Sequence, residues 1–151
     1  FGHLMPNTPP LFALGFLVLF FYPAASRKAI PLMFVMSGML LRTIGRPAIH
    51  IGASTIVYAL AAFLFGSGVV RRDIRSIGLA LLVVFLYGGS LSMGLIPADT
   101  GGSWEGQLSG GIAGVVMALI FRKEDPPKKY SWEEEDDEDG VRKYYKENYF
   151  N

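Results

Sequence analysis

The chain has 151 residues, of which 51% are hydrophobic, and its mean hydropathy is +0.35. A soluble domain rarely holds so much apolar content, and here the apolar residues come in long runs, which is typical of membrane segments. The net charge of +1 hides a split, because residues 1–123 carry nine basic and three acidic side chains, whereas residues 124–151 carry five and ten. There is no cysteine, which excludes disulfides, a thiol nucleophile and thiolate metal sites.

Five apolar segments follow one another along the chain, at about residues 9–25, 29–41, 51–70, 76–97 and 107–121. The third and fourth are long enough to cross a bilayer as helices, whereas the second and fifth are short. Helices are favoured over barrel strands because the runs are long and uniformly apolar. The sequence therefore predicts an all-α membrane helix bundle with five transmembrane helices.

The basic residues between these segments predict the orientation of the bundle. One set of loops carries nine Lys and Arg, and the opposite set carries two. The nine are Arg27, Lys28, Arg71, Arg72, Arg75, Arg122, Lys123, Lys128 and Lys129, and the two are Arg42 and Arg46. Because basic loops remain in the cytoplasm, this bias places the C-terminus there and predicts a cell (inner) membrane protein.

The last 28 residues differ in composition from the rest. Residues 124–151 contain Pro126-Pro127 and seven consecutive acids at 133–139. Such a block cannot bury enough apolar surface to fold alone, which predicts a solvated, disordered cytoplasmic tail after a bundle at residues 1–123. The alternative is a docking segment that uses the aromatic residues Trp132, Tyr144, Tyr145, Tyr149 and Phe150.

Three sets of polar residues lie at the outer ends of the segments. His3 and Asn7 precede the first segment, His50 and Ser54 open the third, and Trp104, Glu105 and Gln107 open the fifth. Each residue has an ordinary structural explanation, such as capping or packing. Their shared depth allows them to converge, however, because polar side chains in a bundle usually face its interior.

Read together, three motifs resemble the rhomboid family of intramembrane serine proteases. They are H-L-M-P-N at 3–7, H-I-G-A-S-T-I-V-Y-A-L at 50–60 and S-W-E-G-Q-L-S-G-G-I-A-G at 103–114. The matching positions are His3, Asn7, Gly52, Ser54, Tyr58, Gly110 and Gly114. The resemblance covers about residues 1–123 and implies that the family's first helix lies upstream of Phe1.

The resemblance also implies a role for each site residue. Ser54 would be the nucleophile, His3 and Asn7 would help to form the oxyanion hole, and Tyr58 would pack against the base. Substrates or clients would be proteins with transmembrane helices inside the lipid bilayer. Neither a cofactor, nor a metal, nor a nucleic-acid partner is implied.

The chain departs from the family pattern at its most important position, where Gln107 replaces the histidine base. A carboxamide does not take up a proton near neutral pH, so the sequence predicts an inactive or impaired protease. Thr55 also replaces the glycine that follows the nucleophile. Prolines 6, 9 and 10 disfavour a continuous helix at the first segment, so His3 and Asn7 need not point together.

Three other hypotheses remain open. The polar cluster could belong to a non-enzymatic membrane interaction protein that binds client transmembrane helices. The chain could instead be an active protease that uses His50 as its base. A small transporter is a distant alternative, because the segments lack internal charged residues. The protease family reading further predicts that Ser54 lies within hydrogen-bond reach of position 107.

Overall fold

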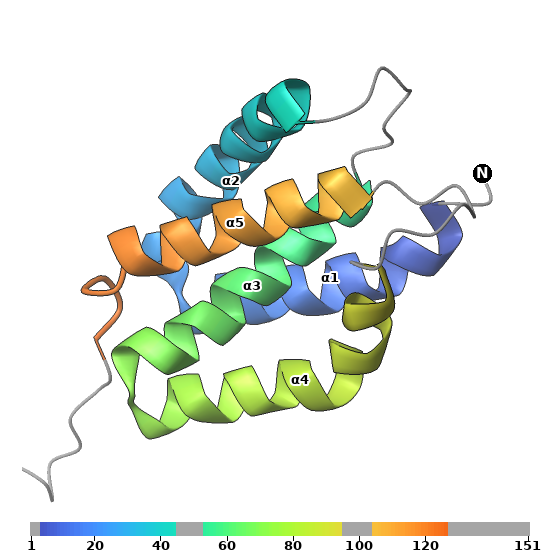
Figure 1. Ribbon diagram of the computed structural model, residues 1–151. Coiled ribbons are helices and arrows are strands. Elements are labelled where there is room, and N and C mark those ends of the chain that lie inside the picture. The colour runs from blue at the N-terminus through green and yellow to red at the C-terminus, as the bar shows by residue number, and fades with distance from the viewer. Residues whose placement is uncertain (1–3, 45–52, 95–103, 127–151) are drawn as a thin grey trace, which may run out of the picture.

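A computed structural model describes residues 4–44, 53–94 and 104–126, and these residues form five α-helices and no strand (Figure 1). The helices are α1 (Leu4–Phe21), α2 (Pro23–Ile44), α3 (Ala53–Arg71), α4 (Ile74–Gly94) and α5 (Trp104–Ile120). The all-α prediction is confirmed for the described residues. The predicted tail beyond residue 126 lies outside them.

The boundary between the first two helices lies earlier in the chain than the sequence predicted. α1 ends at Phe21, Tyr22 is not helical, and Pro23 begins α2. Arg27 and Lys28 were predicted to lie in a loop, which is wrong, because they lie in α2. Proline is favoured at the first helical position, where its missing N–H has no intrahelical partner to lose. α2 is therefore 22 residues long rather than short.

α1 is continuous through the prolines that were expected to interrupt it. It runs from Leu4 to Phe21 with Pro9 and Pro10 inside. Proline is tolerated within membrane helices because neighbouring helices and local adjustments satisfy the freed backbone groups. Asn7 consequently lies on a regular helix, while His3 lies outside the described residues.

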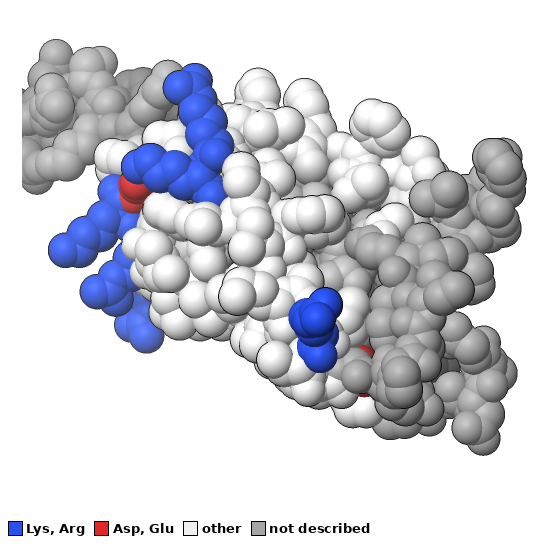
Figure 2. Space-filling view, turned by 90° about the horizontal axis from the view of Figure 1, so that it is seen from above, with Lys and Arg blue, Asp and Glu red and all other residues white. Residues whose placement is uncertain are grey.

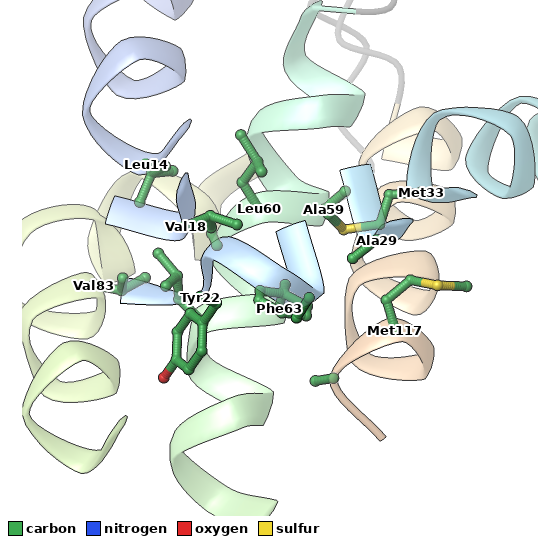
Figure 3. Close-up of a cluster of buried hydrophobic side chains, with 14 of the residues drawn as sticks. Leu14, Val18, Tyr22, Ala29, Met33, Ala59, Leu60, Phe63, Val83 and Met117 are labelled. Atoms are coloured by element: carbon green, nitrogen blue, oxygen red, sulfur yellow. The ribbon is translucent and has the colours of Figure 1, made fainter. Parts of the chain in front are cut away.

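α3 is the central helix, and it contacts each of the other four (Figure 1). Its small residues permit this, since Ala59, Ala61, Gly66, Ser67 and Gly68 are all buried. Figure 3 shows the core around this helix, which combines side chains from all five helices and from the junction at Tyr22. The Tyr22 ring meets the Phe63 ring edge to face at 5.6 Å between centroids.

The surface is more apolar than that of a soluble protein. Large side chains project outward from all five helices, including Phe16 on α1, Phe34 on α2, Phe65 on α3, Phe85 on α4 and Ile120 on α5. Polar side chains lie inside instead, namely Ser26, Ser37, Thr55, Ser67, Ser76, Glu105 and Ser109. Large exposed apolar faces over a small-residue interior fit a lipid environment.

By length and composition, two helices among the described residues can cross a membrane, α2 and α3. The apolar stretches Asn7–Phe21 and Ile74–Gly89 are shorter. The sequence predicted five transmembrane helices, and by this criterion two of the five described helices qualify.

One end of the bundle holds most of the described charge. Figure 2 shows most Lys and Arg side chains gathered at one end, beside a broad uncharged surface. This is the end where α1 meets α2, where α3 meets α4, and where α5 stops. Its basic residues are Arg27, Lys28, Arg71, Arg72, Arg75, Arg122 and Lys123.

The residues after α5 fasten three helices together at this basic end. The Asp125 carboxylate accepts hydrogen bonds from the backbone N–H groups of Ala24 (3.0 Å) and Ala25 (2.8 Å), which caps α2. The Arg71 guanidinium donates to the carbonyl oxygens of Phe121, at 2.8 Å, and Glu124. The first residues of the predicted tail thus bind back onto the bundle.

Asp73 directly precedes α4 at the same end. Its carboxylate accepts a hydrogen bond from the Ser76 backbone N–H at 3.0 Å, and the Tyr22 hydroxyl donates to Ser76 Oγ at 2.8 Å. Burial acts to raise the pKa of Asp73, but the hydrogen bonds from Ser76 and the charge of Arg71 outweigh it and lower the pKa. The ionised carboxylate is therefore the form that stabilises this helix start.

Candidate active site

The close packing of α3 against α5 fixes how the candidate site residues are aligned. A Cβ atom on Gly110 would lie 2.1 Å from the Thr55 carbonyl oxygen, and one on Gly114 would lie 2.1 Å from that of Ala59. A step of four residues along α5, from Gly110 to Gly114, matches a step of four residues along α3, from Thr55 to Ala59. The two helices therefore run parallel. The G-x-x-x-G spacing of Gly110 and Gly114 therefore provides a close approach between the backbones of the two helices.

This alignment brings the first turns of α3 and α5 to the same end of the bundle. Ser54 is the second residue of α3, and Gln107 is the fourth residue of α5. Both are partly buried. Because Arg71 and Phe121 mark the far ends of the same helices, this candidate site lies opposite the basic end.

Thr55, which follows Ser54, packs at the contact between α3 and α5. Its side chain is buried, and its carbonyl oxygen faces Gly110 of α5. A β-branched residue is thus accommodated next to the candidate nucleophile because glycine on the partner helix leaves room for the backbone. The substitution of the family's glycine therefore falls on the α3–α5 contact itself.

Gln107 and Tyr58 line the same groove. The groove has a volume of about 760 Å³, lies against α3, α4 and α5, and is walled mostly by apolar side chains such as Phe65 and Ile112. The Gln107 Oε1 atom is buried and accepts no hydrogen bond from the described residues. A direct hydrogen bond from Ser54 to this oxygen is therefore not formed, and the approach of Ser54 to position 107 stays a prediction.

The remaining predicted site residues divide into two groups. Asn7 is partly buried on α1, a helix that packs against α3. His3, His50 and Gly52 lie outside the described residues, so the expected oxyanion pair and the alternative base are not placed. Within the described ranges, no group of three or more His, Cys, Asp or Glu side chains could hold a metal ion.

Glu105 is a feature that sequence reasoning noted but did not single out. It lies in the first turn of α5 and is only 2% exposed, and the Ser109 hydroxyl donates to its backbone carbonyl at 2.7 Å. An acidic group in the first turn of a helix is favoured by the helix dipole. A lone acid at the head of an apolar segment was the signal that could have identified it as buried.

Comparison with known proteins identifies the family. The model of the Rhomboid domain matches residues 1–124. Uncharacterized proteins of Mycobacterium tuberculosis and Mycobacterium bovis are each 39% identical over 128 residues, covering 79% of this chain and 53% of theirs. One of Mycobacterium leprae is 37% identical over 129 residues, covering 79% and 50%.

The chain spans about half the length of these curated relatives. No solved structure matches it. The family match extends over all five described helices, including both helices that are apolar enough to cross a membrane. The chain therefore belongs to the rhomboid family and is an integral membrane protein.

Proposed function

We propose that this rhomboid-family chain has the site of an intramembrane serine protease but lacks its working base, so that it is inactive or severely impaired. Ser54 is the nucleophile position, Gln107 is the base position, and Tyr58 packs beside it. His3 and Asn7 complete the oxyanion hole in this proposal. The substrates or clients are transmembrane helices of other membrane proteins.

The chemistry of position 107 carries the proposal. A serine hydroxyl becomes a good nucleophile only when a neighbouring base removes its proton. An amide can donate and accept hydrogen bonds, but it has no accessible protonated state near neutral pH. Loss of the base in a catalytic triad lowers turnover by several orders of magnitude, and the residual rate comes from binding and the oxyanion hole.

The surroundings of Gln107 support this reading. Its Oε1 atom is buried beside a groove with an apolar lining, and no described side chain that could act as a base is hydrogen-bonded to it. A buried acceptor without a donor costs roughly 1–3 kcal/mol. That cost is easier to explain if the position is inherited from a catalytic residue than if it was selected for packing.

The same groove favours the second candidate function, a pseudoprotease that binds client helices without cutting them. Its wall offers Phe65, Val84 and Ile112 to an apolar partner, whereas Gln107 Oε1 is buried and is not exposed to that partner. An apolar wall therefore suits a transmembrane helix, whose side chains are mostly apolar.

We further propose that all five helices lie in the cell membrane with the basic end in the cytoplasm. Seven described basic residues gather at that end, which follows the bias of cytoplasmic loops toward Lys and Arg. The candidate site then lies toward the outer surface, where water needed for hydrolysis is available. The acidic residues 127–151 follow on the cytoplasmic side in this proposal.

The test is cleavage of a model transmembrane substrate in liposomes by the purified protein. The unmodified chain should leave the substrate intact, and Gln107→His should cleave it. Ser54→Ala introduced together with Gln107→His should abolish the cleavage. Ser54-dependent cleavage by the unmodified chain would contradict the proposal. Helix binding by all three proteins without cleavage by any would favour the pseudoprotease.

A further inference from the structure

Arg75, at the start of α4, is held by two aromatic rings at the basic end. Its guanidinium carbon lies 5.2 Å from the centroid of the Phe21 ring and 5.7 Å from that of the Tyr22 ring. These distances fall within the range of cation–π contact. The rings fix where the guanidinium group sits, and a cation–π contact leaves the N–H donors unused.

The donors of Arg75 have no hydrogen-bonding partner among the described residues. Its Nε atom is buried and donates no hydrogen bond. Arg71, which lies over the same Tyr22 ring at 4.6 Å, differs because its guanidinium donates to backbone carbonyls after α5. The Nε atom of Arg71 is likewise buried and unpartnered, so the two residues differ at their terminal nitrogens. Those of Arg71 have a structural task within the chain, whereas Nη1 and Nη2 of Arg75 make no hydrogen bond to the described residues and are the atoms left for a ligand.

The acidic groups at this end are already engaged elsewhere. Asp73 accepts from Ser76, Asp125 caps α2, and Glu124 pairs with Lys28 at 2.6 Å. Seven basic residues against these three acids leave a charge of +4 on the described part of this end. Such an excess attracts anions, and the ends of membrane helices lie at the depth of lipid phosphates.

The face of α4 that follows Arg75 points to a lipid rather than to a soluble anion. Leu82 is 39% exposed and Leu86 is 55% exposed. They follow Arg75 by seven and eleven residues, which places them on the same face of the helix as Arg75. An acyl chain could lie along this apolar face while its phosphate remains beside Arg75.

We propose that Arg75 binds the phosphate of an anionic phospholipid whose acyl chain lies along the exposed face of α4. The guanidinium fork matches phosphate oxygens in a two-point contact that a lysine ammonium cannot reproduce. Phe21 and Tyr22 hold this fork in position. The excess positive charge favours phosphatidylglycerol over the zwitterionic phosphatidylcholine.

The test measures binding of phosphatidylglycerol to the full chain in phosphatidylcholine nanodiscs, from the rise in thermal stability as the lipid is titrated. Arg75→Lys keeps the charge but removes the fork, and it should weaken apparent affinity by about tenfold. Arg122→Lys is the matched control, because Arg122 is an exposed cation at the same end. It should leave affinity unchanged.

Phe21→Leu provides a second variant that leaves every charge in place. Loss of the ring that positions the guanidinium should also weaken phosphatidylglycerol binding, and it should do so even if Arg75→Lys unfolds. Glycerol 1-phosphate in solution should not stabilise the protein. The proposal would be overturned if Arg75→Lys and Arg122→Lys changed the affinity equally, or if neither Arg75→Lys nor Phe21→Leu weakened it. It would also be overturned if glycerol 1-phosphate stabilised the protein to the same extent as the lipid.

Discussion

Gly110→Ala tests the α3–α5 contact that aligns the candidate site. The new Cβ atom would lie 2.1 Å from the Thr55 carbonyl oxygen, 3.0 Å from its carbonyl carbon and 3.3 Å from the Ala59 nitrogen. All three are backbone atoms of α3, so no side-chain rotation can relieve the clash. Because carbon–oxygen contacts are normally near 3.3 Å or longer, the two helices would have to separate locally by about 1 Å.

The expected cost follows from two opposing effects. Overpacking of a tightly packed interior costs about 1–3 kcal/mol. Replacing glycine by alanine within a helix recovers up to about 1 kcal/mol. Since the clash is with rigid backbone, the packing cost should fall in the upper part of its range, and the net loss of stability should be about 1–2 kcal/mol.

Gly111→Ala is a matched control on the same helix, because a Cβ atom there meets no heavy atom within 4 Å. It should be neutral or stabilising by up to about 1 kcal/mol. Reversible unfolding of the two variants in the same detergent measures the difference. If Gly110→Ala were as stable as Gly111→Ala, α3 and α5 would not approach as described, and the alignment of Ser54 with position 107 would be unsupported.

Three other predictions concern the basic end and the topology. Asp125→Ala removes the side chain that caps α2, so thermal unfolding should show a loss of about 1 kcal/mol, and unchanged stability would exclude capping. Because the pKa of Asp73 is lowered below its ordinary 3.8, its contribution should be complete above that value and be lost as the pH falls through the folded pKa. Asp73→Asn should remove that part of the acid sensitivity, and an unaltered acid unfolding curve would contradict it. On intact cells, an impermeant thiol reagent should label a cysteine at Thr100 but not one at Arg72, and the reverse would overturn the topology.

The helical class and the basic end could be predicted from the sequence, because both follow from local composition. The long apolar runs allow helices, and the Lys and Arg residues mark one side of the membrane. The G-x-x-x-G spacing of Gly110 and Gly114 can also be seen in the sequence, and the structure places both glycines at a close helix contact. The four-residue spacing of these glycines was sufficient to predict the contact, because it places them on one face of α5.

The break between α1 and α2 could not be predicted in the same way, because the apolar run continues across it. Prolines at 9 and 10 are accommodated within α1, whereas Pro23 starts a new helix. What distinguishes them is the tertiary contact of Tyr22, whose ring packs on Phe63 and beneath Arg71. That contact joins residues 41 to 49 positions apart, which local patterns do not contain.

The candidate site was predictable only through the motifs that resemble the rhomboid family. Hydropathy placed Ser54 and Gln107 at similar depths, but it did not indicate that Gln107 borders a groove with Tyr58 or that its Oε1 atom is buried. The burial of Glu105 was likewise missed, since its environment depends on how α5 packs against the other helices.

Labelling of Ser54 by a serine-reactive fluorophosphonate tests the central claim most directly, because it reports nucleophile activation without requiring a substrate. The unmodified chain should label no more than its Ser54→Ala variant, since Gln107 cannot take up the proton. Gln107→His should label at Ser54 in a folded protein. Strong labelling of the unmodified chain that disappears in Ser54→Ala would contradict the account and show that another base activates the serine.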